Sequence, residues 1–332
     1  MIGSPLRRGV PIVLLFGGLM LAAVLLAPFI GSTPLSFARV FSRSLPFADN
    51  IDAQIFFLAR LPRAVAAALG GGTLAAAGVI FQGLLRNPLA TPYTLGVSAG
   101  ASLGAMVAIT FGAFLPIGGV ATASLVGALV AVLVVYALAS AHQHGLSTTV
   151  LLLAGVTLNA FFSALILFVQ YLSDFAETYR ALRWLMGDLD VAGYGAILAS
   201  LPLVLIAGVA FTWLARPLNL LSLGAEAAGS RGLDVPRAQR VAFFSASLAT
   251  GAAVAVGGPI GFVGIIVPHL VRLVVGADHR LVLPGSALFG AAFLVGCDVL
   301  ARTMLAPLEL PVGIITAILG APFFLWLLLK KR

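Results

Sequence analysis

Long apolar segments dominate the chain, and short polar segments separate them. Apolar runs cover residues 10–31, 61–85, 93–113, 117–139 and 149–172 in the first half, and 195–215, 241–257, 260–277, 281–301 and 312–329 in the second. An α-helix needs about 20 apolar residues to cross the hydrocarbon core of a bilayer, and most of these runs approach that length. The pattern predicts an all-α polytopic membrane protein with about ten transmembrane helices, forming a single domain over residues 1–332.

The composition agrees with this pattern. Hydrophobic residues make up 61% of the 332 residues, charged residues make up 9%, and the mean hydropathy is +1.12. These values lie far from those of soluble globular domains. The net charge of +8 would suggest nucleic acid as a partner of a soluble protein, but the basic residues lie mainly in short loops between apolar runs. Membrane topology explains that placement better, so we expect no nucleic-acid partner.

The distribution of basic residues predicts the orientation in the membrane. With the amino terminus in the cytoplasm, the inner loops hold eleven basic residues against three acidic ones. The outer loops hold six basic residues against seven acidic ones. This difference satisfies the positive-inside rule. We therefore expect both termini in the cytoplasm and a surface in contact with membrane lipid.

Few ionisable residues fall within the predicted helices. They are Arg63 near the outer end of the second helix, His269 and Arg272 in the eighth, and Asp298 near the outer end of the ninth. Intramembrane charges usually mark proton relays or ion sites, so an ion-coupled carrier should contain more of them. Asp298 and Arg302 are four residues apart and can pair on one helix face. His269 has no second histidine in any predicted helix, so we expect no metal or haem site there.

The sequence carries no motif for an energy supply of its own. It lacks the Gly-x-x-x-x-Gly-Lys-[Ser/Thr] phosphate loop, and it also lacks His-Glu-x-x-His, Gly-x-Ser-x-Gly and Cys-x-x-Cys. Its single cysteine, Cys297, can form no disulfide within the chain. We therefore expect no catalytic residue, cofactor or metal ion in this chain. Any fuel for transport must come from a partner.

Small residues and helix breakers shape the apolar runs. Residues 66–72 and 96–104 are rich in glycine, alanine and serine, which allow helices to approach closely. Residues 257–264 contain one proline and four glycines, so this segment should interrupt any continuous helix. Broken backbone at membrane depth normally lines a cavity or is buried in protein.

Five stretches of the chain resemble the FecCD family of permeases, which import iron-siderophores, haem and cobalamin. They are Arg60-Leu61-Pro62-Arg63, residues 82–90, residues 95–101, residues 258–264 with Pro268-His269, and residues 310–316 with Gly320-Ala321-Pro322. The stretches occur in the family's order, and the resemblance covers most of the chain.

The resemblance implies a type II ABC importer permease fold in a bacterial or archaeal cytoplasmic membrane. It also implies a homodimer with the path at its two-fold axis, two cytoplasmic ATPase subunits that bind ATP and Mg²⁺, and an external substrate-binding protein. We expect a non-catalytic permease subunit that moves an iron chelate, siderophore or haem, from the periplasm or exterior to the cytoplasm. The alternatives are a cobalamin importer permease, an ion-coupled secondary carrier, and a scaffold subunit without a transport path.

The longest inner segment, residues 216–240, is the expected coupling element. A Glu-Ala-Ala-x-x-x-Gly pattern in this segment resembles the ATPase-docking loop of importers, and it comprises Glu226, Ala227, Ala228, Gly229 and Gly232. The alanines favour a short helix, which Gly229 and Gly232 can end. Asp234 and Pro236 can then begin the next helix. The plainer interpretation is a solvated loop.

Two further sites are expected from the resemblance. Arg60, Arg63 and Arg302 would lie at the outer mouth, where arginines from both copies would hold carboxylates of a two-lobed binding protein. The local alternative pairs Arg302 with Asp298 and places Arg60 and Arg63 at lipid phosphates. The fifth and tenth helices would line the path, with Asn159 as the main polar group of the fifth. A lone Asn in an apolar helix can equally hydrogen-bond a neighbouring helix.

Overall fold

In the part of the chain that the structure describes, ten helices of 13 to 27 residues each correspond to one predicted membrane span. The computed structural model describes residues 5–42, 46–112, 119–141, 147–190 and 193–330, and these ranges contain no β-strand. The ten helices are α1 (Pro5–Leu26), α4 (Leu61–Leu85), α5 (Val97–Phe111), α6 (Val120–Ser140), α7 (Thr148–Leu172), α9 (Gly195–Leu221), α11 (Val235–Gly257), α12 (Val263–Val275), α13 (His279–Thr303) and α14 (Val312–Lys330). The predicted all-α polytopic fold is confirmed.

Their lengths divide these helices into two groups. Within the described residues, seven helical segments are long and apolar enough to cross a membrane. The helices α5, α12 and α14 are apolar but shorter. The break predicted in residues 257–264 is confirmed, because α11 ends at Gly257 and α12 begins only at Val263. Gly258 and Phe262 between them have φ values of +67° and +66°.

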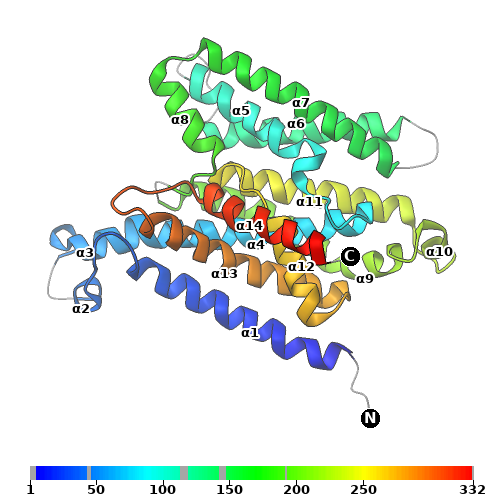
Figure 1. Ribbon diagram of the computed structural model, residues 1–332, viewed down its shortest axis with the longest axis horizontal. Helices are drawn as coiled ribbons and strands as arrows, with labels where there is room; N and C mark the ends of the chain where they lie inside the picture. Colours follow the sequence, from blue (N-terminus) through cyan, green and yellow to red (C-terminus); the bar gives the residue numbers. More distant parts are fainter. Residues whose placement is uncertain (1–4, 43–45, 113–118, 142–146, 191–192, 331–332) are drawn as a thin grey trace.

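Short helices cap the two ends of the bundle. One end carries α2 (Phe37–Val40), α3 (Ile51–Gln54) and a π-helical turn, η3 (Ile55–Arg60), with α8 (Phe175–Leu185) on the same side (Figure 1). The opposite end carries α10 (Ala225–Gly229). Three 3₁₀ turns complete the chain: η1 (Ala27–Phe29), η2 (Phe47–Asp49) and η4 (Pro92–Leu95). We name these ends outer and inner, after the orientation predicted from the basic residues.

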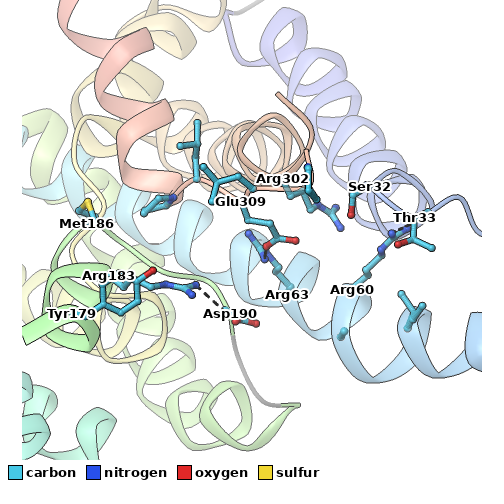
Figure 2. Close-up of a pocket in the computed structure, with 17 residues that line it drawn as sticks. Ser32, Thr33, Arg60, Arg63, Tyr179, Arg183, Met186, Asp190, Arg302 and Glu309 are labelled. Carbon is cyan, nitrogen blue, oxygen red and sulfur yellow. Dashed lines mark hydrogen bonds and ion pairs between the residues drawn. The ribbon is translucent and has the colours of Figure 1, made fainter. Parts of the chain in front are cut away.

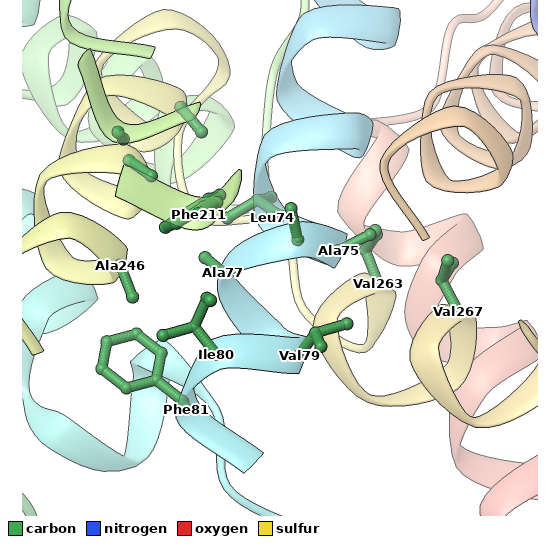
Figure 3. Close-up of a cluster of buried hydrophobic side chains, with 14 of the residues drawn as sticks. Leu74, Ala75, Ala77, Val79, Ile80, Phe81, Phe211, Ala246, Val263 and Val267 are labelled. Carbon is green, nitrogen blue, oxygen red and sulfur yellow. The ribbon is translucent and has the colours of Figure 1, made fainter. Parts of the chain in front are cut away.

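Helix α4 is the centre of the bundle. Twenty of its 25 residues are buried, and α9, α11, α12 and α13 pack around it. Figure 3 shows Phe81 and Ile80 on the side of Ala246 in α11, whereas Val79 lies on the side of Val263 in α12. This helix is surrounded by protein, which explains how it carries Arg63 and Gln82 within an apolar sequence.

Glycines set the closest helix contacts. A Cβ atom added at Gly78 of α4 would lie 2.1 Å from the carbonyl oxygen of Gly264 in α12. A Cβ atom at Gly127 of α6 would lie 2.1 Å from the carbonyl oxygen of Gly100 in α5. The predicted close approach at residues 96–104 is therefore confirmed. The helices α5, α6 and α7 form one side layer of the bundle, and α1 covers the opposite side (Figure 1).

Candidate functional site

A cavity at the outer end is lined by Arg60, Arg63 and Arg302 (Figure 2). Its volume is about 720 Å³. The walls come from residues 31–33, from η3 and the start of α4, from α8, and from the loop between α13 and α14. The fold thus brings together three arginines that lie up to 242 positions apart in the sequence.

Asp298 lies between two of these arginines, Arg63 and Arg302. The Nε atom of Arg63 donates a hydrogen bond of 2.7 Å to Oδ1 of Asp298, and the Nε atom of Arg302 lies 3.4 Å from Oδ2. The Asp298 side chain is fully buried. The expected pair of Asp298 and Arg302 is therefore present, but Asp298 makes its shorter contact with Arg63.

Glu309 extends from the loop between α13 and α14 and also binds Arg63. The Nη1 atom of Arg63 donates to Oε2 of Glu309. Figure 2 shows the Glu309 side chain pointing toward Arg63. Arg60, Arg63, Arg302, Asp298 and Glu309 form what we name the outer ion cluster. In this cluster three positive charges face two negative ones, so one positive charge remains.

Arg60 binds backbone carbonyls rather than a carboxylate. Its Nη1 atom donates to the carbonyl oxygen of Pro28 at 3.2 Å, and its Nη2 atom donates to that of Thr33 at 2.7 Å. Arg60 and Arg63 are both buried in the chain. The alternative in which these two side chains extend to lipid phosphates is wrong, because protein oxygens hold both guanidinium groups.

Arg302 is buried with part of its guanidinium group unsatisfied. Its side chain is 3% exposed, and Nη2 donates to the carbonyl oxygen of Ala27 at 2.8 Å. Among the described residues, its Nε and Nη1 atoms have no hydrogen-bond partner, and neither does Oδ2 of Asp298, although Nε and Oδ2 face each other as an ion pair. Buried donors without partners are uncommon in native proteins, since each costs about 1–3 kcal/mol. Nη1 of Arg302 is therefore a buried donor with neither a hydrogen bond nor an ion pair to a described residue.

At the inner end, α10 projects from the bundle (Figure 1). Ala228 is fully buried and anchors the helix, whereas Glu226 and Gly229 are exposed and Ala227 is partly exposed. Gly232 is exposed with a φ of +82°, and the Leu233 N–H bonds back to the Ala228 carbonyl oxygen at 3.2 Å. This arrangement is typical of a glycine-terminated helix end.

The connection around α10 is shorter than predicted. Helix α9 continues through Arg216 to Leu221, because Leu214, Leu218 and Leu221 remain buried against the core. Helix α11 begins at Val235, where the carboxylate of Asp234 accepts a hydrogen bond of 3.0 Å from the Arg237 N–H. The segment between the two helices therefore covers residues 222–234 rather than 216–240.

Two polar pairs at the inner end were not predicted from the sequence. Asn219 of α9 donates to Asp278 at 2.7 Å, and Arg272 of α12 donates to the side chain of Gln82 in α4. Hydrogen bonding from Arg280 lowers the pKa of Asp278 well below its ordinary value. One pair links α9 to the residue before α13, and the other links α12 to α4. Gln82 and Arg272, two polar residues within apolar runs, are the sequence signals for the second pair.

Asn159 lies on the outward surface of α7. It is exposed, as are Leu153, Val156 and Phe161 of the same helix. In the tenth helix, α14, Ile318 is also exposed. The structure shows no hydrogen bond from Asn159 to a neighbouring helix among the described residues. The outward surface of α7 is thus free to face lipid, water or a second subunit.

Comparison with known proteins identifies the family. Residues 19–330 match the FecCD transport family. The chain is 40% identical to the hemin transport system permease protein of Yersinia pestis, with 96% of each chain covered. It is 46% identical to the cobalamin import system permease protein of Halobacterium salinarum, over 82% of this chain and 73% of the relative.

A solved structure gives the same result for the fold. An inward-facing metal-chelate type ABC transporter superimposes with a TM-score of 0.82 at 32% sequence identity, covering 97% of this chain and 99% of the other. The family match, the two permease relatives and this structure agree over nearly the whole chain. The protein is therefore a multi-pass inner-membrane permease that belongs to the FecCD transport family of ABC importers.

Proposed function

We propose that this chain forms the translocation path of an ATP-driven importer that moves an iron chelate, either a siderophore or haem, into the cytoplasm. The observation that supports it most is the placement of two docking features at opposite ends of one helical bundle. The outer ion cluster lies at one end, and α10 projects from the other. Such a subunit can receive a loaded protein on one side and an ATPase on the other.

We propose that α10 couples ATP hydrolysis to transport, by docking to the ATPase subunits. Two such subunits bind ATP and Mg²⁺. The helix is short, with Glu226 exposed and Ala228 anchored in the core. A small protruding helix with a fixed base suits insertion into a cleft of another subunit. This role also places the inner end and both termini in the cytoplasm, in agreement with the excess of basic residues there.

We also propose that two copies of the chain enclose the path. The exposed surfaces of α7 and α14 carry Asn159 and large apolar side chains, which suit a subunit interface or a path wall. The path then lies between subunits, with Asn159 as a polar group on its wall. The other outward surfaces contact lipid.

Arg60, Arg63 and Arg302 are proposed to dock the external binding protein. They gather in one cavity and carry a net positive charge with their carboxylate partners. A planar guanidinium group can hold a carboxylate bidentately, so a carboxylate on the binding protein is the matching chemistry. Partly exposed charge pairs mainly set orientation and association rate, and docking should weaken with salt.

Cobalamin is the second candidate cargo. The relative named for cobalamin import has the higher identity, at 46%, whereas the relative named for hemin transport matches over more of the chain, at 96%. Titration of the cognate binding protein with haem, ferric siderophores and cobalamin decides between them. We expect saturable binding of an iron chelate. Binding of cobalamin alone would overturn the iron assignment and leave the importer assignment intact.

A further inference from the structure

The two carboxylates of the outer ion cluster differ in their surroundings. The Asp298 side chain is fully buried and lies between two arginines, whereas the Glu309 side chain is 43% exposed and forms an ion pair with Arg63 alone among the described residues. Moving a fully buried carboxylate away from its arginines would leave buried charges uncompensated, so we expect Asp298 to stay in place. A half-exposed carboxylate on a loop can exchange with another, because water readily solvates it once it is released.

The loop that carries Glu309 has its own fixed shape. It joins α13 to α14, with a bridge between Leu305 and Leu308 and a hydrogen bond of 2.9 Å from the Leu310 N–H to the Ala301 carbonyl oxygen. The backbone is therefore held in place, and the half-exposed Glu309 side chain can turn to water by rotation about its own bonds once it leaves Arg63. Release of Glu309 from Arg63 requires no rearrangement of the helices.

The cluster has capacity for an additional carboxylate. Nη1 of the buried Arg302 has no partner among the described residues, and the cluster carries one positive charge more than its two carboxylates neutralise. A second carboxylate entering the cavity, which Arg63 and Arg302 both line, meets the Nη1 atom of Arg63 that now holds Glu309. The entering group and Glu309 thus compete for the same donor.

We propose that Glu309 is an internal stand-in for the partner carboxylate: it occupies Arg63 while the outer face is free, and the binding protein displaces it on docking. This proposal rests on the docking role proposed above for the arginines. On displacement, the Nη1 donor of Arg63 passes from Glu309 to the incoming carboxylate, and Glu309 turns to water. Asp298 keeps its bond to Nε of Arg63 throughout. The stand-in keeps Arg63 from holding unrelated anions between docking events.

The displacement also changes a contact near the start of α14. Glu309 lies three residues before Val312, where α14 begins. Gly313 packs against the carbonyl oxygen of Met186 just after α8, since a Cβ atom there would lie 2.2 Å from it. Docking therefore removes one of the contacts that hold the loop before α14, which is a helix proposed to line the path.

The test measures affinity between the cognate binding protein and the assembled importer in lipid nanodiscs, over a series of salt concentrations. Apparent affinity scales with the fraction of molecules whose site is free. If Glu309 occupies Arg63 in about 70–90% of molecules, then Glu309→Gln tightens docking by about three- to tenfold at low salt. Glu309→Ala should act in the same direction. Asp49→Asn is the matched control, because it removes an exposed acidic charge of the outer end that does not line the cavity.

A double-mutant cycle shows whether the effect of Glu309→Gln on docking acts through Arg63. In an Arg63→Gln background, Glu309→Gln should no longer tighten docking, because the shared donor is gone. Thermal unfolding of each variant in detergent checks that it is folded. If Arg63→Gln weakens docking and Glu309→Gln changes it no more than Asp49→Asn does, the proposed displacement of Glu309 is wrong. The docking role of the arginines is then still supported. If folded Arg63→Gln and Arg60→Gln variants dock like the parent, the docking role itself is wrong.

Discussion

Asp298 is the residue that holds the outer ion cluster together. Its carboxylate is fully buried and faces the guanidinium groups of both Arg63 and Arg302. Desolvation makes a buried ion pair weak evidence for net stability, but removal of one member leaves the other charge buried and uncompensated. The structural role of Asp298 is therefore tested by the stability of a variant that lacks its charge.

We predict that Asp298→Asn lowers the free energy of unfolding by about 3–5 kcal/mol, since two buried arginines then face no adjacent buried anion. Thermal unfolding of the purified protein in detergent measures the effect. Glu309→Gln is the control, because it also removes a negative charge at Arg63 but from a half-exposed position, where about 1 kcal/mol or less is expected. Equal losses for the two variants would contradict the assignment of Asp298 as the structural member.

Residue contacts of this kind were only partly predictable. The pair of Asp298 and Arg302 lies one helical turn apart and could be expected from spacing alone. The contact of Arg63 with Asp298 spans 235 positions and depends on the packing of α4 against α13. The local alternative placed the Arg63 side chain at lipid phosphates, because no acidic residue lies near Arg63 in the sequence.

At the scale of elements, the packing of α4 against α12 depends on two glycines. Gly78 and Gly264 bring the two backbones into contact, and no side chain fits between them. Alanine normally favours a helix over glycine by about 1 kcal/mol, so an ordinary helical site tolerates the exchange. At Gly78, the higher helix propensity of alanine and the steric clash with α12 therefore change the free energy of unfolding in opposite directions.

We predict that Gly78→Ala destabilises the protein by about 1–3 kcal/mol, because the added methyl group meets the backbone of α12. Gly208→Ala in α9 is the matched control, since a Cβ atom there has open space. Unfolding in detergent compares both variants with the parent. Equal stability of Gly78→Ala and Gly208→Ala would show that α4 and α12 do not approach as closely as described.

The coupling element offers a second glycine comparison. Gly232 has a φ of +82°, whereas Gly229 is the last residue of α10, and a Cβ atom has open space at either position. A residue with a side chain costs about 1–2 kcal/mol in the left-handed conformation. We predict that Gly232→Leu distorts the end of α10 and lowers ATP-driven uptake several-fold, without loss of membrane insertion. Uptake by reconstituted importers measures this.

Gly229→Leu separates backbone conformation from side-chain bulk in that experiment. It adds the same side chain three residues earlier, and it should reduce uptake less than Gly232→Leu. Parent-like coupling in folded Gly232→Leu importers would remove residues 222–234 from the transmission of ATP hydrolysis.

Most elements were predictable because apolar runs and helix breakers are local signals. The predicted helix at residues 61–85 matches α4, and the predicted break at 257–264 lies between α11 and α12. The limits of 216–240 failed at both ends, because Arg216 and Pro217 read as a helix end while tertiary packing continues α9 to Leu221. Such boundaries depend on burial, which a linear pattern does not contain.

At the scale of the whole molecule, α7 presents an outward surface that faces lipid, water or a second subunit. We predict that cysteines placed singly at positions 151–168, in a Cys297→Ser background, react with a water-soluble thiol reagent along one face that includes Asn159. Leu151 and Phe162 are buried within the chain and should stay unreactive. Complete protection of the outward positions would place α7 against lipid and remove it from the path.

The central claim is that the chain is the permease subunit of an ATP-driven importer, and ATP-dependent uptake in vesicles tests it most directly. The chain, its ATPase and its binding protein are reconstituted into proteoliposomes with labelled ferric siderophore, haem or cobalamin on the side of the binding protein. We expect uptake that requires both ATP and the binding protein, with no stimulation by a proton or sodium gradient. Uptake driven by an ion gradient without ATP would contradict it and identify an ion-coupled carrier.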